Sequence, residues 1–150
     1  MTGGATSTGV VLAIDAGTTG VRTRAVFADA RPSIADYREF TQHYPQPGWV
    51  EHDAEEIWQA VRATIQSVCA QINEPIAANG ITNQRETVVA FNRRTGEPLH
   101  RAIVWQDRRT AARCDVLGDQ LSVVRSTTGL VLDPYFSGSK MEWLLHNTEI

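Results

Sequence analysis

One long amphipathic segment stands between short apolar runs, and this alternation constrains the fold more than any other feature. Its apolar residues recur at helical spacing: Ile57, Val61, Ile65, Val68 and Ile72. A helix with such a stripe has to bury it against another element. Because strand-like runs precede and follow it, the sequence predicts an α/β fold with a mixed β-sheet and flanking helices.

Both ends of this helix carry recognisable signals. Asp53 precedes the apolar stripe, and Glu56 follows three residues later, which is the spacing of a capping box. A proline disfavours helical geometry in the residue before it, so Glu74-Pro75 should end the segment. We therefore expect a helix that starts at Asp53 and ends before Pro75.

The strand pattern predicts a β-hairpin at the start of the fold. Val10–Ile14 is a short apolar run, the turn GTTG follows Asp15, and strand-like residues resume at Arg22–Phe27. Further strands are expected at Glu39–Tyr44, Ile76–Thr82, Thr87–Phe91 and Leu99–Trp105. The last two flank RRTGEP, which is typical of a hairpin turn.

The second half of the chain predicts two more helices. One should run from about Arg108 to Leu121, and another should begin near Ser139, which has capping-box spacing with Glu142. Asn79 is unexpected, because Ile76–Thr82 otherwise resembles a buried strand. A buried amide without a partner would cost about 1–3 kcal/mol.

Composition excludes several classes of function. The net charge of -3 gives no electrostatic footprint for nucleic acid, and no apolar run is long enough to cross a bilayer. Residues 1–9 lack the features of a secretory signal and are expected to be a flexible lead-in. Cys69 and Cys114 are expected to be reduced thiols of a cytoplasmic protein. The four histidines have no ligand spacing, which argues against a zinc site.

The segment DAGTTG is the first candidate for chemistry. Gly17 allows a tight turn and close approach to a ligand, and successive N–H groups in such a turn can bind an anion. Thr18 and Thr19 add hydroxyl groups, and Arg22 is within reach of a phosphate. Asp15 could hold Mg²⁺ through water. The alternative is a plain hairpin turn whose glycine and threonine residues only satisfy turn geometry.

A second candidate is the adjacent pair Arg85 and Glu86, in GITNQRETV. Neighbouring side chains of a strand point to opposite faces, so a shared site requires the backbone to bend there. Arginine supplies only donors and carboxylate only acceptors, so together they can grip adjacent hydroxyl groups of a small polyol. Trp105 could form an apolar wall, and Tyr135 could add a hydroxyl. The alternative is that these residues make surface ion pairs and ordinary core contacts.

Several motifs, in this order, resemble the amino-terminal part of the glycerol kinases, a branch of the FGGY carbohydrate kinases. They are AIDAGTTGVR, YPQPGWVEHDAEEIW, GITNQRET, AIVWQDRRTA and TGLVLDPYFSGSK. The resemblance runs from about Val10 to Ile150. It implies the first lobe of a ribonuclease H-like, actin-like ATPase fold.

The resemblance implies transfer of the ATP γ-phosphoryl group to a terminal hydroxyl of glycerol, with ATP and Mg²⁺ as cofactors. The implied glycerol-binding positions are Arg85, Glu86 and Tyr135, with Trp105 as a wall of the pocket. The implied phosphate-contacting positions are Thr18, Thr19, Gly20 and Arg22, with Asp15 near the metal. No catalytic residue is expected in this segment, because the family's general base is an aspartate further downstream.

The resemblance also sets expectations for the whole chain. Residues 10–150 should form an incomplete first lobe that lacks the second ATPase lobe and is inactive alone, whereas the full-length form should be a homo-oligomer. The family usually has Gln where Ala16 stands and Ser or a similar residue where Gly20 stands. Two alternatives stay open: a non-catalytic polyol-binding or interaction module, and a kinase for another polyol or sugar.

Overall fold

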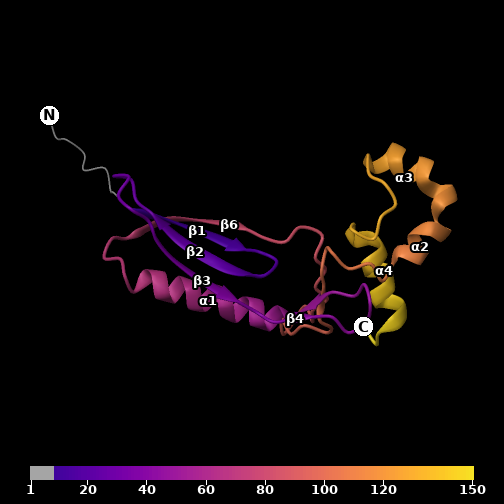
Figure 1. Cartoon of the computed structure of the whole chain (residues 1–150), viewed down its shortest axis with the longest axis horizontal. Helices are drawn as coiled ribbons and strands as arrows, with labels where there is room; N and C mark the ends of the chain where they lie inside the picture. Colours follow the sequence, from indigo (N-terminus) through magenta and orange to yellow (C-terminus); the bar gives the residue numbers. More distant parts are fainter. Residues whose placement is uncertain (1–8) are drawn as a thin grey trace. The chain divides into compact units, whose positions relative to one another are not determined.

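The computed structural model describes residues 9–150, which form two compact units. Unit 1 contains residues 9–40 and 56–84, and unit 2 contains residues 41–55 and 85–150. Figure 1 shows the elements of both units along the chain. The predicted lead-in, apart from Gly9, lies outside the described residues.

Unit 1 is built on a four-stranded mixed sheet, as the sequence predicts. Its strands are β1 (Val10–Ala16), β2 (Gly20–Val26), β3 (Ile34–Glu39) and β6 (Ile76–Thr82), in the spatial order β3-β2-β1-β6. β1 pairs antiparallel with β2 and parallel with β6, and β3 pairs antiparallel with β2. The expected opening hairpin is therefore present.

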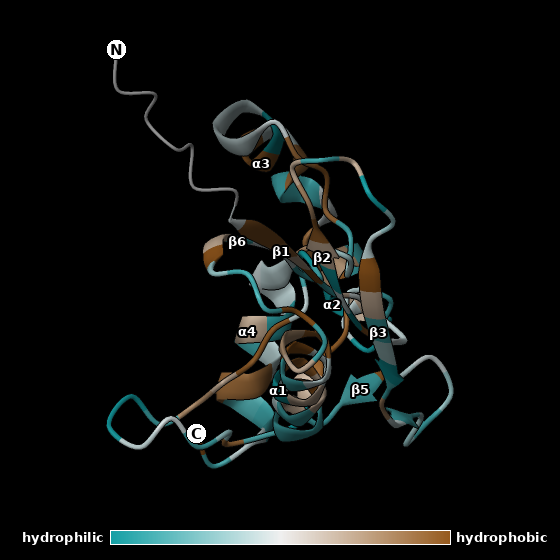
Figure 2. Cartoon of the chain, turned by 90° about the vertical axis from the view of Figure 1, so that its left-hand side faces the viewer, coloured by the Kyte–Doolittle hydropathy of each residue, from teal (hydrophilic) through white to brown (hydrophobic). Residues whose placement is uncertain are grey.

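Helix α1 (Ala54–Cys69) packs on one face of this sheet. Val10, Leu12 and Val68 are among the buried residues of one core cluster, and Ile14 belongs to a second. The predicted apolar stripe is confirmed, since its other members pack against these clusters: Ile57, Val61, Ile65 and Ile72. Figure 2 shows the hydrophobic residues of β1 and β6 in brown.

The ends of α1 are only partly as expected. The N–H of Glu55 donates a hydrogen bond to Asp53 Oδ1 at 2.8 Å, so Asp53 satisfies one of the unpaired donors of the first turn. The helix ends at Cys69, well before Glu74-Pro75. A loop, not the proline itself, therefore separates α1 from β6.

Two expectations about strands are wrong. The third strand is Ile34–Glu39 rather than Glu39–Tyr44, where only the two-residue β4 (Gln42–His43) forms. β3 is an edge strand with mostly exposed, polar side chains, so it lacks the apolar signal of a covered strand. The strand β6 forms as expected at the other edge of the sheet, but all seven of its residues are exposed, so the expectation of a buried strand is wrong. Asn79 is thus exposed and needs no buried partner.

Unit 2 contains a small antiparallel sheet of β4, β5 (Glu51–His52) and β7 (Ala102–Ile103). The hairpin expected around RRTGEP is present as antiparallel bridges of Val88 with Ile103 and Phe91 with Pro98. Gly96 sits in its turn with φ of 79°, a conformation that favours glycine. Pairing in this hairpin is confined to short bridges, so its flanks are not continuous strands.

The first helical segment of unit 2 is divided, whereas the sequence predicts one continuous helix. In place of one helix over 108–121 there are α2 (Ala111–Val116), the 3₁₀ turn η1 (Gly118–Gln120) and α3 (Leu121–Thr128). α4 (Ser137–Asn147) begins two residues before the predicted start. The proposed capping box is wrong, because the Ser139 hydroxyl contacts the Thr110 hydroxyl and Glu142 pairs with Arg113.

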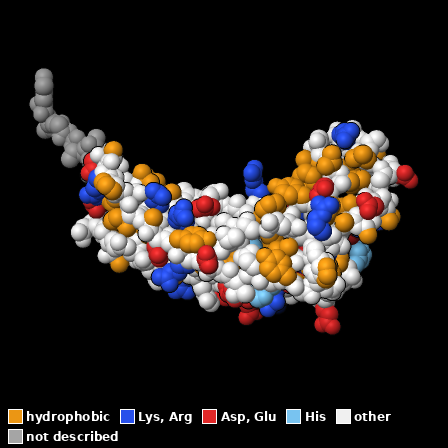
Figure 3. Space-filling model, viewed as in Figure 1, with side chains coloured by type: hydrophobic (Ala, Val, Ile, Leu, Met, Phe, Trp, Pro, Cys, Tyr) orange, Lys and Arg blue, Asp and Glu red, His pale blue; other side chains and the backbone are white. Residues whose placement is uncertain are grey.

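Large apolar side chains are exposed around α2, α3 and the segment that follows. Val116, Val123, Leu130 and Val131 are each more than two-fifths exposed. Figure 3 shows hydrophobic side chains gathered over this part of unit 2. Within residues 9–150, no helix has both the length and the apolar character needed to cross a membrane.

Candidate functional site

The turn between β1 and β2 is closed by hydrogen bonds rather than by unusual glycine geometry. The Gly17 N–H donates to the Gly20 carbonyl at 3.0 Å, and Gln84 Nε2 donates to the Gly17 carbonyl at 2.9 Å. Neither glycine has a positive φ, but a Cβ atom at Gly17 would lie 3.2 Å from the Gly20 carbonyl oxygen, so the tight turn favours glycine at this position. Gln84 also fixes the turn from the end of β6.

Tyr37 on β3 explains why residue 20 is glycine. A Cβ atom at Gly20 would lie 2.5 Å from the Arg38 carbonyl oxygen and 2.6 Å from the Tyr37 hydroxyl. The Tyr37 hydroxyl also lies 3.3 Å from Thr19 Oγ1, and the Arg22 guanidinium carbon lies 5.2 Å from the centre of the Tyr37 ring. The Tyr37 hydroxyl therefore occupies space that a side chain at position 20 would need.

Asp15 and Arg22 lie opposite each other in the β1–β2 register. Both are exposed, and they line a depression on the sheet together with Gly80, Ile81 and Thr82. A single exposed carboxylate fits Mg²⁺, which keeps several waters and takes its other ligands from substrate phosphates. Unit 1 therefore places Asp15, Thr19, Gly20 and Arg22 near one turn, and half-buried Thr18 lies within that turn.

The backbone does bend at the Arg85–Glu86 pair. Both residues form a turn, and Glu86 has φ of 64°, which is uncommon for a residue other than glycine. Such strained positions persist only where surrounding contacts hold them. Arg85 is exposed beside it, whereas Glu86 is half-buried.

Glu86 is held at the N-terminus of α4. Its Oε2 accepts hydrogen bonds from the Ser137 N–H at 2.8 Å and from the Ser137 hydroxyl at 2.7 Å. These bonds hold the pKa of Glu86 below its usual value, and Lys140 and Arg85 contribute further. A carboxylate at this end of a helix is also favoured by the helix dipole. Glu86 thus stays ionised and serves as the cap of α4, whose N-cap residue makes no side-chain cap bond of its own.

Trp105 and Tyr135 are brought together next to this helix end. Their ring centroids lie 6.0 Å apart at an interplanar angle of 72°, an edge-to-face contact. The backbone N–H of Trp105 donates to Thr87 Oγ1 at 3.2 Å, which ties Trp105 to the residue after Glu86. Unit 2 thus collects the four predicted polyol residues around the 85–87 turn and the start of α4.

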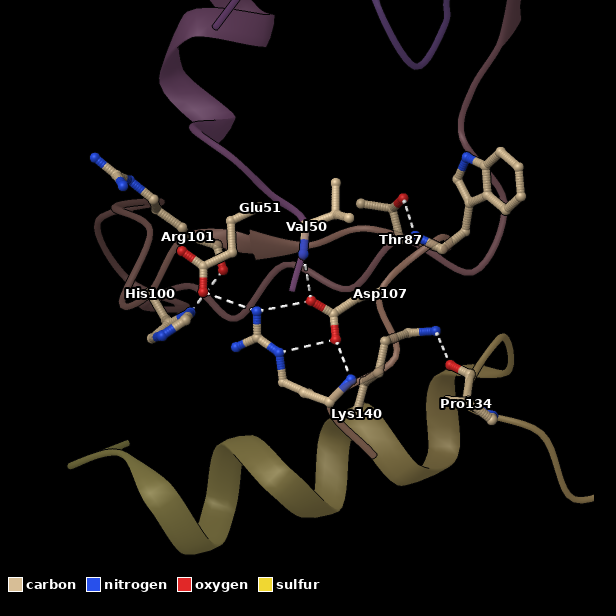
Figure 4. A network of polar contacts seen from close by, with 10 residues as sticks. Val50, Glu51, Thr87, His100, Arg101, Asp107, Pro134 and Lys140 are labelled. Atoms are coloured by element: carbon tan, nitrogen blue, oxygen red, sulfur yellow. Dashed lines mark hydrogen bonds and ion pairs between the residues drawn. The ribbon is translucent and has the colours of Figure 1, made fainter. Parts of the chain in front are cut away.

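A buried ion-pair network holds the turn that follows Trp105. Arg109 Nη2 donates to Asp107 Oδ2 at 2.9 Å and to Glu51 Oε1 at 2.8 Å, and all three side chains are almost fully buried. The Arg109 guanidinium also lies over the rings of Trp49 and Trp143, 3.9 and 4.6 Å from their centroids. Figure 4 shows Glu51 and Asp107 pointing at the same guanidinium, and the Val50 N–H reaching Asp107.

Sequence reasoning missed the residues that support these groups. Gln84, Tyr37 and Ser137 each contact a predicted site residue from a distant part of the sequence or from another strand. In the sequence, Gln84 and Ser137 could have been found only by their position, because they lie in the quoted motifs close to Arg85 and Tyr135. Tyr37 lies in none of these motifs. Within the motif YPQPGWVEHDAEEIW, Glu51 has a structural role, because it belongs to the Arg109 network.

The comparison with protein families identifies the class: this is a carbohydrate kinase domain. Residues 10–150 match the FGGY family of carbohydrate kinases, N-terminal domain, and the chain belongs to that family. Among curated relatives, it is 54% identical over 148 residues to "Glycerol kinase" of Rhizobium rhizogenes, covering 94% of this chain and 29% of the relative. It is also 54% identical over 139 residues to "Glycerol kinase" of Gluconobacter oxydans, covering 27% of that relative.

Solved structures show the same fold. The crystal structure of Plasmodium falciparum glycerol kinase with ADP matches 95% of this chain with a TM-score of 0.87 and 30% identity. The gluconate kinase of Lactobacillus acidophilus matches with a TM-score of 0.86 at 20% identity, which supports the fold alone. The predicted actin-like ATPase fold is therefore confirmed, and the chain spans 29% of the length of each of these two structures.

Proposed function

We propose that the complete product of this gene is an ATP-dependent glycerol kinase, to which this chain contributes the polyol pocket and part of the phosphate site. The observation that carries the proposal is the gathering of Glu86, Trp105 and Tyr135 at the start of α4. The similarity to named glycerol kinases supports the choice of acceptor.

The polyol site works by complementary hydrogen bonding. Glu86 Oε2 is occupied by Ser137, and no residue within 9–150 donates to Oε1, which is therefore available to accept from a glycerol hydroxyl. Arg85 donates to a neighbouring hydroxyl from the same turn. The edge-to-face pair of Trp105 and Tyr135 provides an apolar surface for the carbon chain and one hydroxyl at its rim.

The phosphate site works through donors and charge. Thr18, Thr19 and the Gly20 N–H are the donors for ATP phosphate oxygens, and Arg22 offsets their charge. Asp15 would hold hydrated Mg²⁺, which lowers the charge of the transferring phosphoryl group when it is bound. The fixed turn helps because phosphoryl transfer depends mainly on positioning and electrostatic stabilisation.

The reaction forms a bond between phosphorus and a terminal glycerol oxygen and breaks the bond to the β-phosphate, releasing ADP. The hydroxyl proton must pass to a base, and the family resemblance assigns that base to an aspartate downstream of this segment. We therefore expect residues 1–150 alone to give no turnover. We also expect the complete product to act in the cytoplasm as a homo-oligomer.

A polyol panel tests the proposal. The complete gene product is assayed by ADP release with glycerol, erythritol, xylulose and gluconate, and kcat/KM should be highest for glycerol. A higher kcat/KM for a sugar or sugar acid would assign another acceptor. Absence of ADP release with every acceptor would support the non-catalytic alternative.

A further inference from the structure

Lys140 is an unusual residue in this chain. Of the 14 lysine and arginine residues, it alone is lysine, and its side chain is fully buried, at 0% exposure. Lysine is almost never fully buried unless it is paired. No ion pair joins Lys140 to a carboxylate in the described part of the chain, so a different interaction must explain its position.

The ammonium group of Lys140 binds backbone carbonyl groups. Its Nζ donates to the Pro134 carbonyl at 3.0 Å and also to the Tyr135 carbonyl. Figure 4 shows Lys140 reaching from α4 to Pro134. A compact ammonium with rotatable donors can serve two adjacent carbonyl oxygens in a closed space, whereas the larger planar fork of arginine is suited to carboxylates.

Helix stability does not account for this lysine. It stands one turn after Ser137, the first residue of α4, and a cation is unfavourable at the N-terminal end of a helix. Burial also lowers its pKa, although Glu86, Asp107 and Asp133 counteract that effect in this order. Burial therefore disfavours the charged form of Lys140, and its hydrogen bonds fall on the segment that carries Tyr135.

We propose that Lys140 is a positioning residue of the polyol site. It fixes the Pro134–Tyr135 turn, so that the Tyr135 ring meets Trp105 and the helix end stays aligned with Glu86. Lys140 itself does not touch the polyol. This inference rests on the proposed function, because it assumes that Glu86 and Tyr135 bind the acceptor.

The test compares kinetic constants in the complete gene product. Lys140→Met keeps the volume of the side chain but removes its donors, and it should raise the KM for glycerol at least tenfold. The KM for ATP and kcat should change less than twofold, because the phosphate turn belongs to unit 1. Arg125→Met, which removes an exposed cation of α3, is the matched control and should leave all three constants unchanged.

Tryptophan fluorescence checks that each variant is folded. If Lys140→Met does not fold, Lys140→Arg carries the test, and the same selective rise in glycerol KM is expected because its fork cannot serve both carbonyl groups. An unchanged glycerol KM in the folded variant would overturn the inference. So would a change of similar size in all three constants, because the effect would then not be selective for glycerol.

Two further variants separate this inference from the proposed function. Glu86→Gln and Tyr135→Phe should each raise the glycerol KM. If they do so while the Lys140 variants leave it unchanged, only the role of Lys140 is refuted. If they too have no effect, the proposed polyol site is refuted and the Lys140 inference with it.

Discussion

Gln84 Nε2 donates a hydrogen bond of 2.9 Å to the carbonyl oxygen of Gly17, linking the end of β6 to the turn between β1 and β2. Gln84 directly precedes the Arg85–Glu86 pair in the sequence. The segment GITNQRET therefore supports the proposed phosphate turn with one side chain and supplies the proposed polyol site with the next two. This dual use explains why such a polar run follows a strand.

Removing this contact should weaken ATP binding. Gln84→Ala loses a hydrogen bond of about 1 kcal/mol, so the KM for ATP in the complete gene product should rise about fivefold. Gln71→Ala is the control, because Gln71 makes the same kind of bond to the Ser67 carbonyl at 2.9 Å, away from the turn. Equal ATP constants for the two variants would remove Gln84 from the phosphate site.

The space at Gly20 gives a second prediction. Gly20→Ser forces the new Cβ against the Arg38 carbonyl and the Tyr37 hydroxyl, and overpacking of this kind costs about 1–3 kcal/mol. Gly80→Ser is the control, because a Cβ there meets nothing within 4 Å. Urea unfolding measures both, and adding Tyr37→Ala to Gly20→Ser should recover part of the loss. A Gly20→Ser variant as stable as Gly80→Ser contradicts the geometry.

The Arg109 network should dominate the stability of unit 2. Arg109→Met leaves the buried carboxylates of Asp107 and Glu51 without their partner, which should lower the free energy of unfolding by about 3–5 kcal/mol. Arg113→Met breaks the exposed pair with Glu142 and should have a much smaller effect. Tryptophan fluorescence in urea follows both, because Trp49 and Trp143 flank Arg109. Similar losses for the two variants would show that burial of the network matters little.

His52 predicts a pH dependence of stability. It is fully buried and lies 2.6 Å from Gln42 Oε1, and burial, with a smaller effect of His43, lowers its pKa from 6.5 to about 4. As the pH falls, His52 therefore binds a proton in the unfolded state at a higher pH than in the folded state. The free energy of unfolding should drop by up to about 3 kcal/mol between pH 6.5 and 4. Below pH 4, His52 should contribute no further change.

Urea unfolding at several pH values tests the role of His52. In His52→Gln this part of the pH dependence should disappear, whereas His146→Gln, at an exposed position of α4, should keep the wild-type dependence. Identical pH profiles for wild type and His52→Gln would contradict the assignment.

The parts of the fold that were predictable are those with a one-sided apolar pattern. α1 was predictable because its whole stripe packs on the sheet, and the β1–β2 hairpin because its turn is short. β3 was missed because an exposed edge strand carries no such pattern. The break at Gly118 and the existence of α3 were missed because the apolar spacing continues across it.

For the candidate site, the sequence nominates charged and aromatic residues, but it does not reveal the groups that hold them in place. Glu86 and Ser137 are 51 positions apart, and nothing local signals that one caps the helix of the other. Gly20 and Tyr37 form a pair only through the register of β2 and β3. The burial of Lys140 depends likewise on how α4 meets the preceding turn.

Phosphorus NMR of the reaction of the complete gene product with ATP, Mg²⁺ and glycerol shows where the γ-phosphoryl group goes. We expect the γ-phosphate signal to be replaced by that of glycerol 3-phosphate, in equal amount to the ADP formed, and Glu86→Gln to slow this replacement at low glycerol concentration. Formation of ADP and inorganic phosphate without a phosphate ester, or no loss of ATP at all, would contradict the proposed function.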